Sequence, residues 1–279
     1  MTTARLAPRT ALFLPASNPR AIEKARGLGA DLVILDLEDA VKPADKASAR
    51  IAAVEAVVQG FGTSLSAIRF NAVDTAEHGE DVAAIAGSQA DFAVLPKAES
   101  ADAVADVARS LGKPLLVMIE TPLGVLNAAA IAAVPGVVGL IIGTNDLAAS
   151  LRLPPLSGRA QMGLSLQAVV LAARAAGIWA LDGVFNKLDD PDGLTTECCE
   201  GRALGYDGKS LIHPNQIAIA ARAFGPSEAE LAEARALVAA ATGGAERYDG
   251  RMIEAMHVDQ ARALLGRAMD YAGSDDFLA

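Results

Sequence analysis

Two stretches decide the fold of this chain: PLLVMIE at residues 114–120 and GVVGLIIGTND at residues 136–146. Each is a short aliphatic run that closes on an acidic residue, Glu120 in the first and Asp146 in the second. Runs that are apolar on both faces are typical of strands buried in a parallel sheet. Two carboxylates at one rim of such a sheet would lose hydration and repel each other, so a divalent metal ion is the simplest way to stabilise them.

Six more runs of the same kind occur along the chain, and Ala-rich segments of helical character separate them. They are TALFL (10–14), DLVILDLE (31–38), SAIRFN (66–71), DFAVLP (91–96), IWALDG (178–183) and YDGKSLIH (206–213). Asn18-Pro19 marks the first helix start, and a second helix is expected over residues 43–60. Eight strands alternating with helices predict an α/β fold, a (β/α)8 TIM barrel. The alternative is an open doubly wound sheet, but no GxGxxG turn follows the first strand.

The alternation ends after about Phe224. We expect a barrel over residues 1–225 that carries the metal site, and a C-terminal helical extension over residues 226–279 that pads the barrel or contacts a neighbouring subunit. In the extension, GPSEAELAEARALVAAAT predicts a helix with Ser227 as N-cap, GGAERYDGR a linker or short hairpin, and MIEAMHVDQARALLGRAMDYA a last helix. The length of 279 residues suits a barrel of about 250 residues with an appendage.

Composition and charge exclude several classes of protein. Hydrophobic residues make up 52% of the chain, as expected for a folded globular protein. The formal net charge of -10 argues against nucleic acid as a partner. No apolar run approaches the roughly 18 residues of a membrane span, so we expect no membrane segment and a cytoplasmic location. Cys198 and Cys199 are adjacent and cannot form a disulfide framework or a CxxC metal site, so packing roles are predicted for both.

Active sites of (β/α)8 barrels lie at the carboxyl ends of the strands, so polar residues there are candidate functional residues. They are Asp36, Glu38, Asp39, Arg69, Asn71, Lys97, Glu99, Glu120, Asn145, Asp146, Asp182 and His213. Five of the strands would deliver a carboxylate. An oxygen-rich rim with few histidines suits Mg²⁺ or Mn²⁺ rather than Zn²⁺.

Several of these residues also have structural interpretations. Any of the three acids that follow the second strand could cap the next helix or pair with Arg69 or Lys97. Arg69 lies in an apolar strand and needs an anionic partner, either a protein carboxylate or a substrate carboxylate that it grips with two parallel hydrogen bonds. His213, just before Pro214, is predicted to be structural rather than a ligand.

The N-terminal segment is basic although the protein is acidic. Residues 1–26 contain Arg5, Arg9, Arg20, Lys24 and Arg26 and one acid, Glu23. This segment is either a candidate anion site or a solvated basic face on the first helix.

Seven stretches occur in a fixed order between about residues 10 and 225: LFLPASNPRAIEKA, ADLVILDLEDAVKPADKASAR, IRFN, AVLPKAES, VMIETPLGVLNA, GLIIGTNDLAASL and GYDGKSLIHPNQI. With DGRMIEA further on, they resemble the citrate lyase beta subunit and the wider HpcH/HpaI aldolase and CoA-ester lyase family. The resemblance implies a (β/α)8 barrel that binds Mg²⁺, or Mn²⁺, through Glu120 and Asp146. It also implies that Arg69 and Glu120 contact the substrate, with Arg69 gripping the oxygens of the keto or hydroxy acid.

Further roles follow from the same resemblance. Glu38 and Asp39 would lie around the metal or hold metal-bound water. In CoA-using members, basic residues around the first helix meet the CoA phosphates, and Arg20 and Lys24 occupy matching places. A homotrimer or hexamer is implied, and a citrate lyase complex would require partner subunits. CoA or a carrier-protein arm would present the same thioester.

Members of the family cleave a 3-hydroxyacyl-CoA into an acyl-CoA and an oxo acid, or run the reverse condensation. Their acid-base group resembles an Asp from an adjacent subunit in a DGxMIDxP motif, where this chain has Glu254 and no following Pro. The leading hypothesis is a Mg²⁺-dependent lyase acting on citryl-CoA, malyl-CoA or citramalyl-CoA, with Glu254, or Asp259 in its place, moving the proton.

Three alternatives remain open. The first is a metal-dependent aldolase acting on a free 2-oxo acid without CoA, and the second is hydrolysis of a CoA ester. The third is a non-enzymatic subunit that binds a metal and an acidic ligand within a larger complex.

Overall fold

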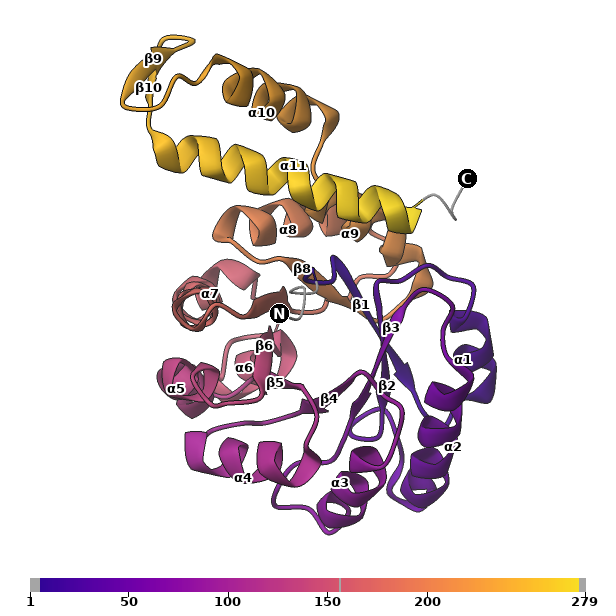
Figure 1. The fold of residues 1–279 in the computed structure, drawn as a ribbon. Coiled ribbons are helices and arrows are strands. Elements are labelled where there is room, and N and C mark those ends of the chain that lie inside the picture. The colour runs from indigo at the N-terminus through magenta and orange to yellow at the C-terminus, as the bar shows by residue number, and fades with distance from the viewer. Residues whose placement is uncertain (1–5, 156, 276–279) are drawn as a thin grey trace. The chain divides into compact units, whose positions relative to one another are not determined.

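Eight parallel strands close into a barrel in chain order in the computed structural model, which describes the backbone of residues 6–155 and 157–275 and side chains up to residue 268 (Figure 1). The strands are β1 (Thr10–Pro15), β2 (Leu32–Asp36), β3 (Leu65–Arg69), β4 (Phe92–Leu95), β5 (Leu115–Ile119), β6 (Val137–Ile142), β7 (Trp179–Asp182) and β8 (Gly208–Leu211). Pairing of β1 with β8 closes the sheet. The predicted (β/α)8 barrel is confirmed, and all eight strand predictions fall on observed strands.

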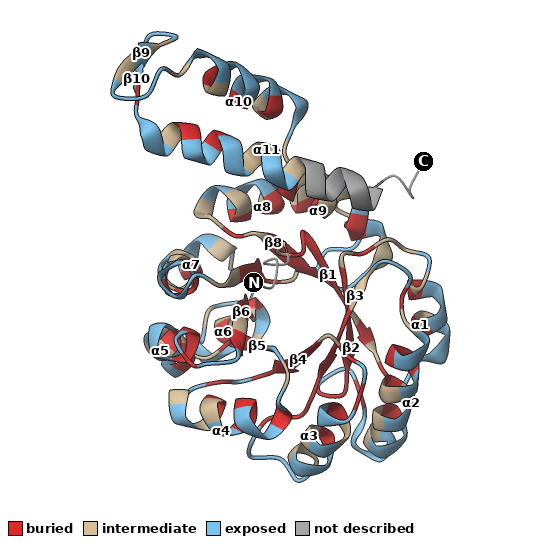
Figure 2. Cartoon of the chain, viewed as in Figure 1, coloured by how far each residue is buried: buried red, intermediate tan, exposed pale blue. Residues whose placement is uncertain are grey.

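Helices cover the outside of the barrel, with their buried faces turned to the strands and their outer faces exposed (Figure 2). They are α1 (Pro19–Ala25), α2 (Lys46–Gln59), α3 (His78–Ala86), α4 (Ala101–Leu111), α5 (Pro122–Ala132), α6 (Thr144–Ser150), α7 (Gly163–Ala176), α8 (Pro191–Leu204) and α9 (Ile217–Phe224). Three short 3-10 turns, η1 (Pro43–Asp45), η2 (Arg159–Met162) and η3 (Pro214–Gln216), precede helices. The helix expected over residues 43–60 is therefore a 3-10 turn followed by α2.

The first helix starts where the sequence predicts. Asn18 accepts a 3.1 Å hydrogen bond from the Ala21 N–H through its Oδ1, and Pro19 occupies the first turn. The side chain thus satisfies one of the amide groups that have no partner inside the helix.

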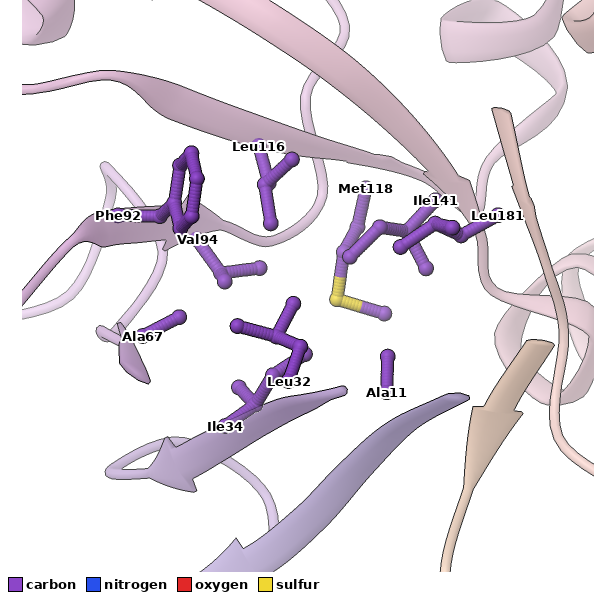
Figure 3. Close-up of a cluster of buried hydrophobic side chains, with 10 residues drawn as sticks. All are labelled: Ala11, Leu32, Ile34, Ala67, Phe92, Val94, Leu116, Met118, Ile141 and Leu181. Carbon is purple, nitrogen blue, oxygen red and sulfur yellow. The ribbon is translucent and has the colours of Figure 1, made fainter. Parts of the chain in front are cut away.

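The barrel interior is filled by apolar side chains from seven of the strands. They are Ala11, Leu32, Ile34, Ala67, Phe92, Val94, Leu116, Met118, Ile141 and Leu181, which point toward one another (Figure 3). Because side chains alternate across a strand, the residue two positions further along also faces the interior. That step carries Ile34 to Asp36, Ala67 to Arg69 and Met118 to Glu120. The interior therefore changes from apolar to charged at the carboxyl ends of the strands.

The charged layer occupies one side of the barrel. On the other side the corresponding inward positions hold small residues, Gly143 after β6, Gly183 after β7 and Ser210 in β8, by the same alternation. A side chain at Gly183 would collide with Thr144, since its Cβ would lie 2.6 Å from Oγ1 of that residue. The small residues leave space beside the charged ones.

The described chain divides into two compact units, Ala7–Ala221 and a second that contains Arg222–Asp275. The boundary falls inside α9, whereas the sequence analysis divides the chain between residues 225 and 226. That division stays a prediction, because compactness alone does not establish which parts fold independently.

The second unit has its own small core. Helix α10 (Glu228–Ala240) begins at Ser227 with a capping box, in which Ser227 and Glu230 bond each other's backbone amides. Strands β9 (Glu246–Tyr248) and β10 (Arg251–Ile253) form an antiparallel hairpin that leads into α11 (Ala255–Asp275). Buried side chains from α10, β10 and α11 pack together: Ala234, Leu237, Ile253, Val258 and Ala261. The N-cap prediction for Ser227 is confirmed.

The hairpin turn is made by Asp249 and Gly250, whose φ angles are 45° and 78°. A two-residue turn with both φ angles positive matches the twist of the strands it joins, and Asp-Gly is a preferred sequence for it. The predicted short hairpin is confirmed. The last helix, predicted from Met252, begins instead at Ala255, because Met252 and Ile253 pair with β9. Among the described residues, no helix has the length and apolar character needed to cross a membrane.

Candidate active site

A cavity of about 330 Å³ opens at the carboxyl ends of the barrel strands. Four carboxylates and one guanidinium line it, together with apolar side chains. The lining residues include Phe13, Asp36, Asp39, Arg69, Met118, Glu120, Ile142, Gly143, Thr144, Asn145, Asp146, Val184, Ser210 and Ile212. The cavity therefore joins residues from strands far apart in the sequence, as expected for the rim of a (β/α)8 barrel.

Arg69 is held at the centre of this layer by protein carboxylates. Its Nε and Nη2 donate to Asp36 Oδ1 and Oδ2 at 2.7 and 2.6 Å, and its Nη1 lies 3.0 Å from Glu38 Oε2. The guanidinium also lies 5.1 Å above the ring of Phe13. Burial lowers the pKa of Arg69, but the hydrogen bond and charge of Asp36 more than compensate and raise it overall. Arg69 is thus a fixed cation with a settled orientation.

Glu38 connects Arg69 to Lys97. Its Oε1 accepts a 2.5 Å hydrogen bond from Lys97 Nζ, whereas Oε2 is buried beside Arg69 without the geometry of a hydrogen bond. Burial raises the pKa of Glu38, and the charge of Arg69 opposes that rise. Arg69 and Glu38 form an ion pair, since charges 3.0 Å apart attract even when the donor angle is poor.

Glu120, which follows β5, is almost completely buried at 2% exposure. Its Oε1 accepts a 2.7 Å hydrogen bond from the Lys97 backbone N–H. Burial raises the pKa of Glu120 to about 7, the Lys97 N–H lowers it, and the charge of Glu38 raises it further. The other oxygen faces Gly143, where a Cβ would lie 2.3 Å from Oε2. Glycine is therefore required for this carboxylate to keep its position.

Lys97 organises the rim through both its backbone and its side chain. Its φ of 52° is in the left-handed region, unusual for a residue with a side chain, and turns its N–H to Glu120. The ammonium group pairs with Glu38 and Asp39 and lies 3.9 Å from Asp146 Oδ2. Burial lowers the pKa of Lys97, but the hydrogen bond to Glu38 outweighs this and raises it overall. The lysine remains charged among carboxylates.

Asp146 lies in the first turn of α6 and its side chain is 40% exposed. It lines the same cavity as Glu120, so the structure brings together the two predicted metal ligands. The neighbouring Asn145 turns to Asn186 instead, and the two amides exchange hydrogen bonds of 2.7 and 3.3 Å. Asn145 thus positions the loops beside the site.

The donor set fits a hard divalent cation. Glu120 and Asp146 supply carboxylate oxygens. Among the described residues no cluster of three or more His, Cys, Asp or Glu side chains is placed to hold a metal ion, so the protein would provide only part of the coordination. Mg²⁺ is commonly held by one or two carboxylates, with water and substrate oxygens completing its coordination. A cation here would also stabilise the ionised form of Glu120, which burial disfavours.

Asp182 does not belong to the cavity, contrary to the prediction that it lies at the rim. Its neighbour Leu181 faces the interior, so Asp182 points outward and is fully buried. It accepts hydrogen bonds of 2.9 and 3.0 Å from Arg159 and of 3.1 Å from Lys209, which also pairs with Glu197 at 2.7 Å. Two cations and two anions thus form a network between the strands and α8, in which Asp182 and Lys209 are buried and Arg159 and Glu197 are partly buried.

Other rim residues have structural roles. His213 caps η3, its Nδ1 accepting from the Asn215 N–H at 3.2 Å, which confirms the structural interpretation. Asn71 donates to Asp81 through its backbone and side-chain amides. Glu99 is exposed, and its carbonyl accepts a 2.7 Å hydrogen bond from Asn127. None of these three lines the cavity.

The basic N-terminal segment is only partly available to an anion. Arg9 is buried and pairs with Asp31 at 3.0 Å, and Arg26 bonds Glu23 and lies over the ring of Phe61. These two arginines support the fold, so their inclusion in an anion site was wrong. Arg20 and Lys24 are exposed, four residues apart on α1 and therefore on one face. Arg5 lies outside the described residues.

The remaining predicted residues lie in the second unit and in α8. Glu254 is exposed at the start of α11, where its N–H donates to His257 Nδ1 at 3.0 Å. Asp259 is exposed and pairs with Arg262 at 3.5 Å. Cys198 is buried, as expected for a packing residue, but Cys199 is exposed, so the packing prediction for Cys199 was wrong.

Three features of the site were missed by sequence reasoning: the backbone of Lys97, Gly143 beside Glu120, and Ser210 in the cavity wall. Glycine and serine carry no distinct chemical signal in a sequence. The alternation of inward and outward residues along β6 and β8 could have placed the last two.

A closed parallel barrel with a carboxylate-rich cavity at the carboxyl ends of its strands is the arrangement of a barrel enzyme. Residues 9–214 match the HpcH/HpaI aldolase/citrate lyase family, and the chain belongs to this family.

The relatives carry two kinds of name. A (3S)-malyl-CoA thioesterase of Cereibacter sphaeroides is 45% identical, with 93% of this chain and 94% of that protein covered. The citrate lyase subunit beta of Leuconostoc mesenteroides subsp. cremoris is 34% identical over 83% of this chain and 82% of that protein. A crystal structure of CitE from Mycobacterium tuberculosis in complex with magnesium, acetoacetate and coenzyme A is 35% identical, with a TM-score of 0.82 over 94% of this chain and 98% of that chain.

Proposed function

We propose that this protein is a Mg²⁺-dependent carbon-carbon lyase that cleaves, or forms, a 3-hydroxyacyl-CoA thioester such as malyl-CoA, citramalyl-CoA or citryl-CoA. The observation that carries the proposal is the pairing of Glu120 and Asp146 in one cavity beside the fixed guanidinium of Arg69. Related CitE structures of M. tuberculosis hold magnesium with acetoacetate and coenzyme A, or with oxaloacetate.

In this proposal Glu120 and Asp146 hold the metal ion, which is Mg²⁺, with Mn²⁺ as the alternative. The bound cation would act as a Lewis acid toward oxygens of the oxo acid. Arg69, kept charged and oriented by Asp36, stabilises negative charge on the same part of the substrate. Glu38 and Asp39 hold the surrounding cations and water in place.

Cleavage breaks the bond between the carbinol carbon and the carbon next to the thioester. The hydroxyl proton is lost, the carbinol becomes the oxo group, and the electron pair of the broken bond passes into the thioester enolate. Protonation of that enolate at carbon gives the acyl-CoA. We assign this proton to the carboxyl group of Glu254 of a neighbouring copy in a homotrimer or hexamer. The proton lost from the hydroxyl group passes to solvent, and Glu254 regains a proton from solvent, so no net proton is gained or lost.

Arg20 and Lys24 are proposed to bind the CoA phosphates, because both are exposed on one face of α1. Exchanging both for Glu should raise KM for a thioester and leave the affinity for a free oxo acid unchanged. A matched control is Arg109→Glu, which reverses an exposed cation on α4. Equal effects of the two variants on KM would refute the assignment.

The test of the reaction uses purified protein, Mg²⁺ and a panel of (3S)-malyl-CoA, citramalyl-CoA and citryl-CoA. A lyase releases an oxo acid and an acyl-CoA, and Glu120→Gln should abolish the release by removing a metal ligand charge. Glu254→Gln should slow turnover strongly, whereas Glu228→Gln, another exposed carboxylate near a helix start, should not. Absence of oxo acid across the panel would overturn the lyase proposal.

A second candidate is hydrolysis of the thioester, since relatives 41% to 45% identical bear the name (3S)-malyl-CoA thioesterase. Hydrolysis breaks the carbon-sulfur bond and leaves the hydroxy acid intact. Chromatography separates the two reactions, because hydrolysis yields free CoA and malate while cleavage yields acetyl-CoA and glyoxylate.

A further inference from the structure

Ser210 lies inside the barrel, in the wall of the cavity opposite the charged layer. In β8 it pairs in register with Ala11 of β1, whose side chain belongs to the interior cluster. Residues in register on parallel strands face the same side of the sheet, so Ser210 also faces inward. Its side chain is 2% exposed and lines the cavity together with Arg69 and Glu120.

The Ser210 hydroxyl has no hydrogen-bond partner among the described residues. Other buried serines in the described chain differ: Ser66 Oγ donates to Asp91 at 3.1 Å, and Ser88 Oγ donates to the Ile85 carbonyl at 2.8 Å. Leaving a buried polar group unpaired costs about 1–3 kcal/mol. Alanine at residue 210 would avoid that cost, so the hydroxyl is best explained by a partner that enters the cavity.

Among the charged side chains that line the cavity, four carboxylates face one cation. Asp36, Asp39, Glu120 and Asp146 present carboxylate oxygens, and Arg69 already directs its Nε and Nη2 to Asp36 and its Nη1 to Glu38. A ligand that carries acceptor oxygens therefore needs additional donors. The Ser210 hydroxyl is an uncommitted donor, and its burial places it where a hydrogen bond is strengthened by the low local dielectric.

We propose that Ser210 donates a hydrogen bond from Oγ to an oxygen of the oxo acid portion of the substrate, and that it is a substrate-binding residue. The assignment of a 2-oxo acid as the ligand rests on the proposed function. Ser210 acts by direct contact, so its removal weakens binding of the oxo acid whether or not the thioester is present.

The test is an equilibrium titration of pyruvate and of glyoxylate into the full chain in the presence of Mg²⁺. Ser210→Ala should weaken binding about tenfold, the factor that corresponds to one hydrogen bond of roughly 1.4 kcal/mol. Its melting temperature should stay the same or rise, because an unpaired buried hydroxyl is removed. The matched control, Ser66→Ala, deletes a buried strand hydroxyl that is paired to Asp91, so it should lower the melting temperature and leave the affinity unchanged.

A second pair of variants guards against misfolding of the first. Ser210→Thr and Ser210→Val have nearly the same shape and differ in the hydroxyl group, so Thr should bind the oxo acid more tightly by a similar factor. Equal affinities of the wild type and Ser210→Ala, or of the Thr and Val variants, would overturn the proposal.

The outcomes also separate this inference from the proposed reaction. If wild-type protein cleaves a thioester but Ser210→Ala binds oxo acid normally, the Ser210 assignment is wrong and the reaction stands. If wild-type protein cleaves nothing but loses oxo acid affinity on removal of the hydroxyl, the reaction fails and Ser210 stands. If wild-type protein binds neither oxo acid, the Ser210 assignment is overturned directly.

Discussion

The backbone N–H of Lys97 donates a 2.7 Å hydrogen bond to Oε1 of Glu120, while the side chain of the same lysine lies 3.9 Å from Asp146. One residue therefore contacts both proposed metal ligands. The backbone contact orients Glu120, and the ammonium group competes with a cation for the surrounding negative charge.

We predict that Lys97→Met tightens Mg²⁺ binding by roughly three- to tenfold, because a positive charge near the cation site is removed. The backbone hydrogen bond to Glu120 does not depend on the side chain and should remain. Isothermal titration calorimetry measures the change. Lys113→Met is the control, since Lys113 bonds the carbonyls of Ser88 and Ala90, whereas Lys97 lies beside Asp146. Weaker binding in Lys97→Met would show that the ammonium group supports the site.

Gly143→Ala should disable the metal site while leaving the barrel folded. A Cβ at residue 143 would lie 2.3 Å from Oε2 and 2.5 Å from Cβ of Glu120, so the carboxylate must move. Displacement of a functional group by about 1 Å can lower a reaction rate on the order of 100-fold. Metal coordination is similarly sensitive to position, so we expect at least a tenfold loss of Mg²⁺ affinity. Gly163→Ala is the control, as a Cβ there meets nothing within 4 Å. Unchanged affinity in Gly143→Ala would contradict the role of Glu120.

The stabilisation of the protein by Mg²⁺ should increase with pH. In the metal-free protein the pKa of Glu120 is raised to about 7, above the ordinary carboxyl value of 4.5, so the folded state holds a proton that the unfolded state releases. Stability from this group is therefore present at low pH and is lost as pH rises toward 7. Mg²⁺ binds the ionised carboxylate and so restores the stability that is lost when Glu120 ionises.

Melting curves with Mg²⁺ and with EDTA, taken between about pH 5.5 and 8, measure this linkage. The difference in melting temperature should widen through pH 7 in wild-type protein and should be small in Glu120→Gln at every pH. A constant difference across the range would count against a titrating Glu120.

Asp182→Asn should destabilise the barrel by about 3–5 kcal/mol, because it leaves the buried Lys209 and the partly buried Arg159 with less compensating charge. Urea denaturation provides the measurement. Asp106→Asn removes an exposed carboxylate that pairs with Arg109 and should cost less than about 1 kcal/mol. Similar losses in the two variants would mean that the buried network adds little. Mg²⁺ affinity should be unaffected in Asp182→Asn.

The barrel could be predicted because each strand is a short aliphatic run and each interval has helical character. The pairing of Glu120 and Asp146 in one cavity could be predicted for the same reason, since carboxyl ends of parallel strands share a rim. The preference of Asn and Ser for helix N-cap positions also allowed the caps at Asn18 and Ser227 to be predicted.

Other parts of the site depend on contacts that the sequence pattern does not encode. Asp182 was expected at the rim, but its position next to the inward Leu181 turns it outward. The positive φ of Lys97 and the close approach of Gly143 to Glu120 are set by packing between neighbouring strands. The engagement of Arg9 by Asp31 removes a charge that looked available in the sequence.

The length of the Asp249-Gly250 turn sets the register of β9 and β10 in the second unit. It fixes Tyr248 opposite Arg251, and through that register it buries Ile253 and leaves Glu254 exposed at the next position. A single inserted or deleted residue in the turn would reverse the facing of the strand. Ile253 would then leave its core, and Glu254 would point the opposite way. Both the number of residues in this turn and their identity are therefore constrained.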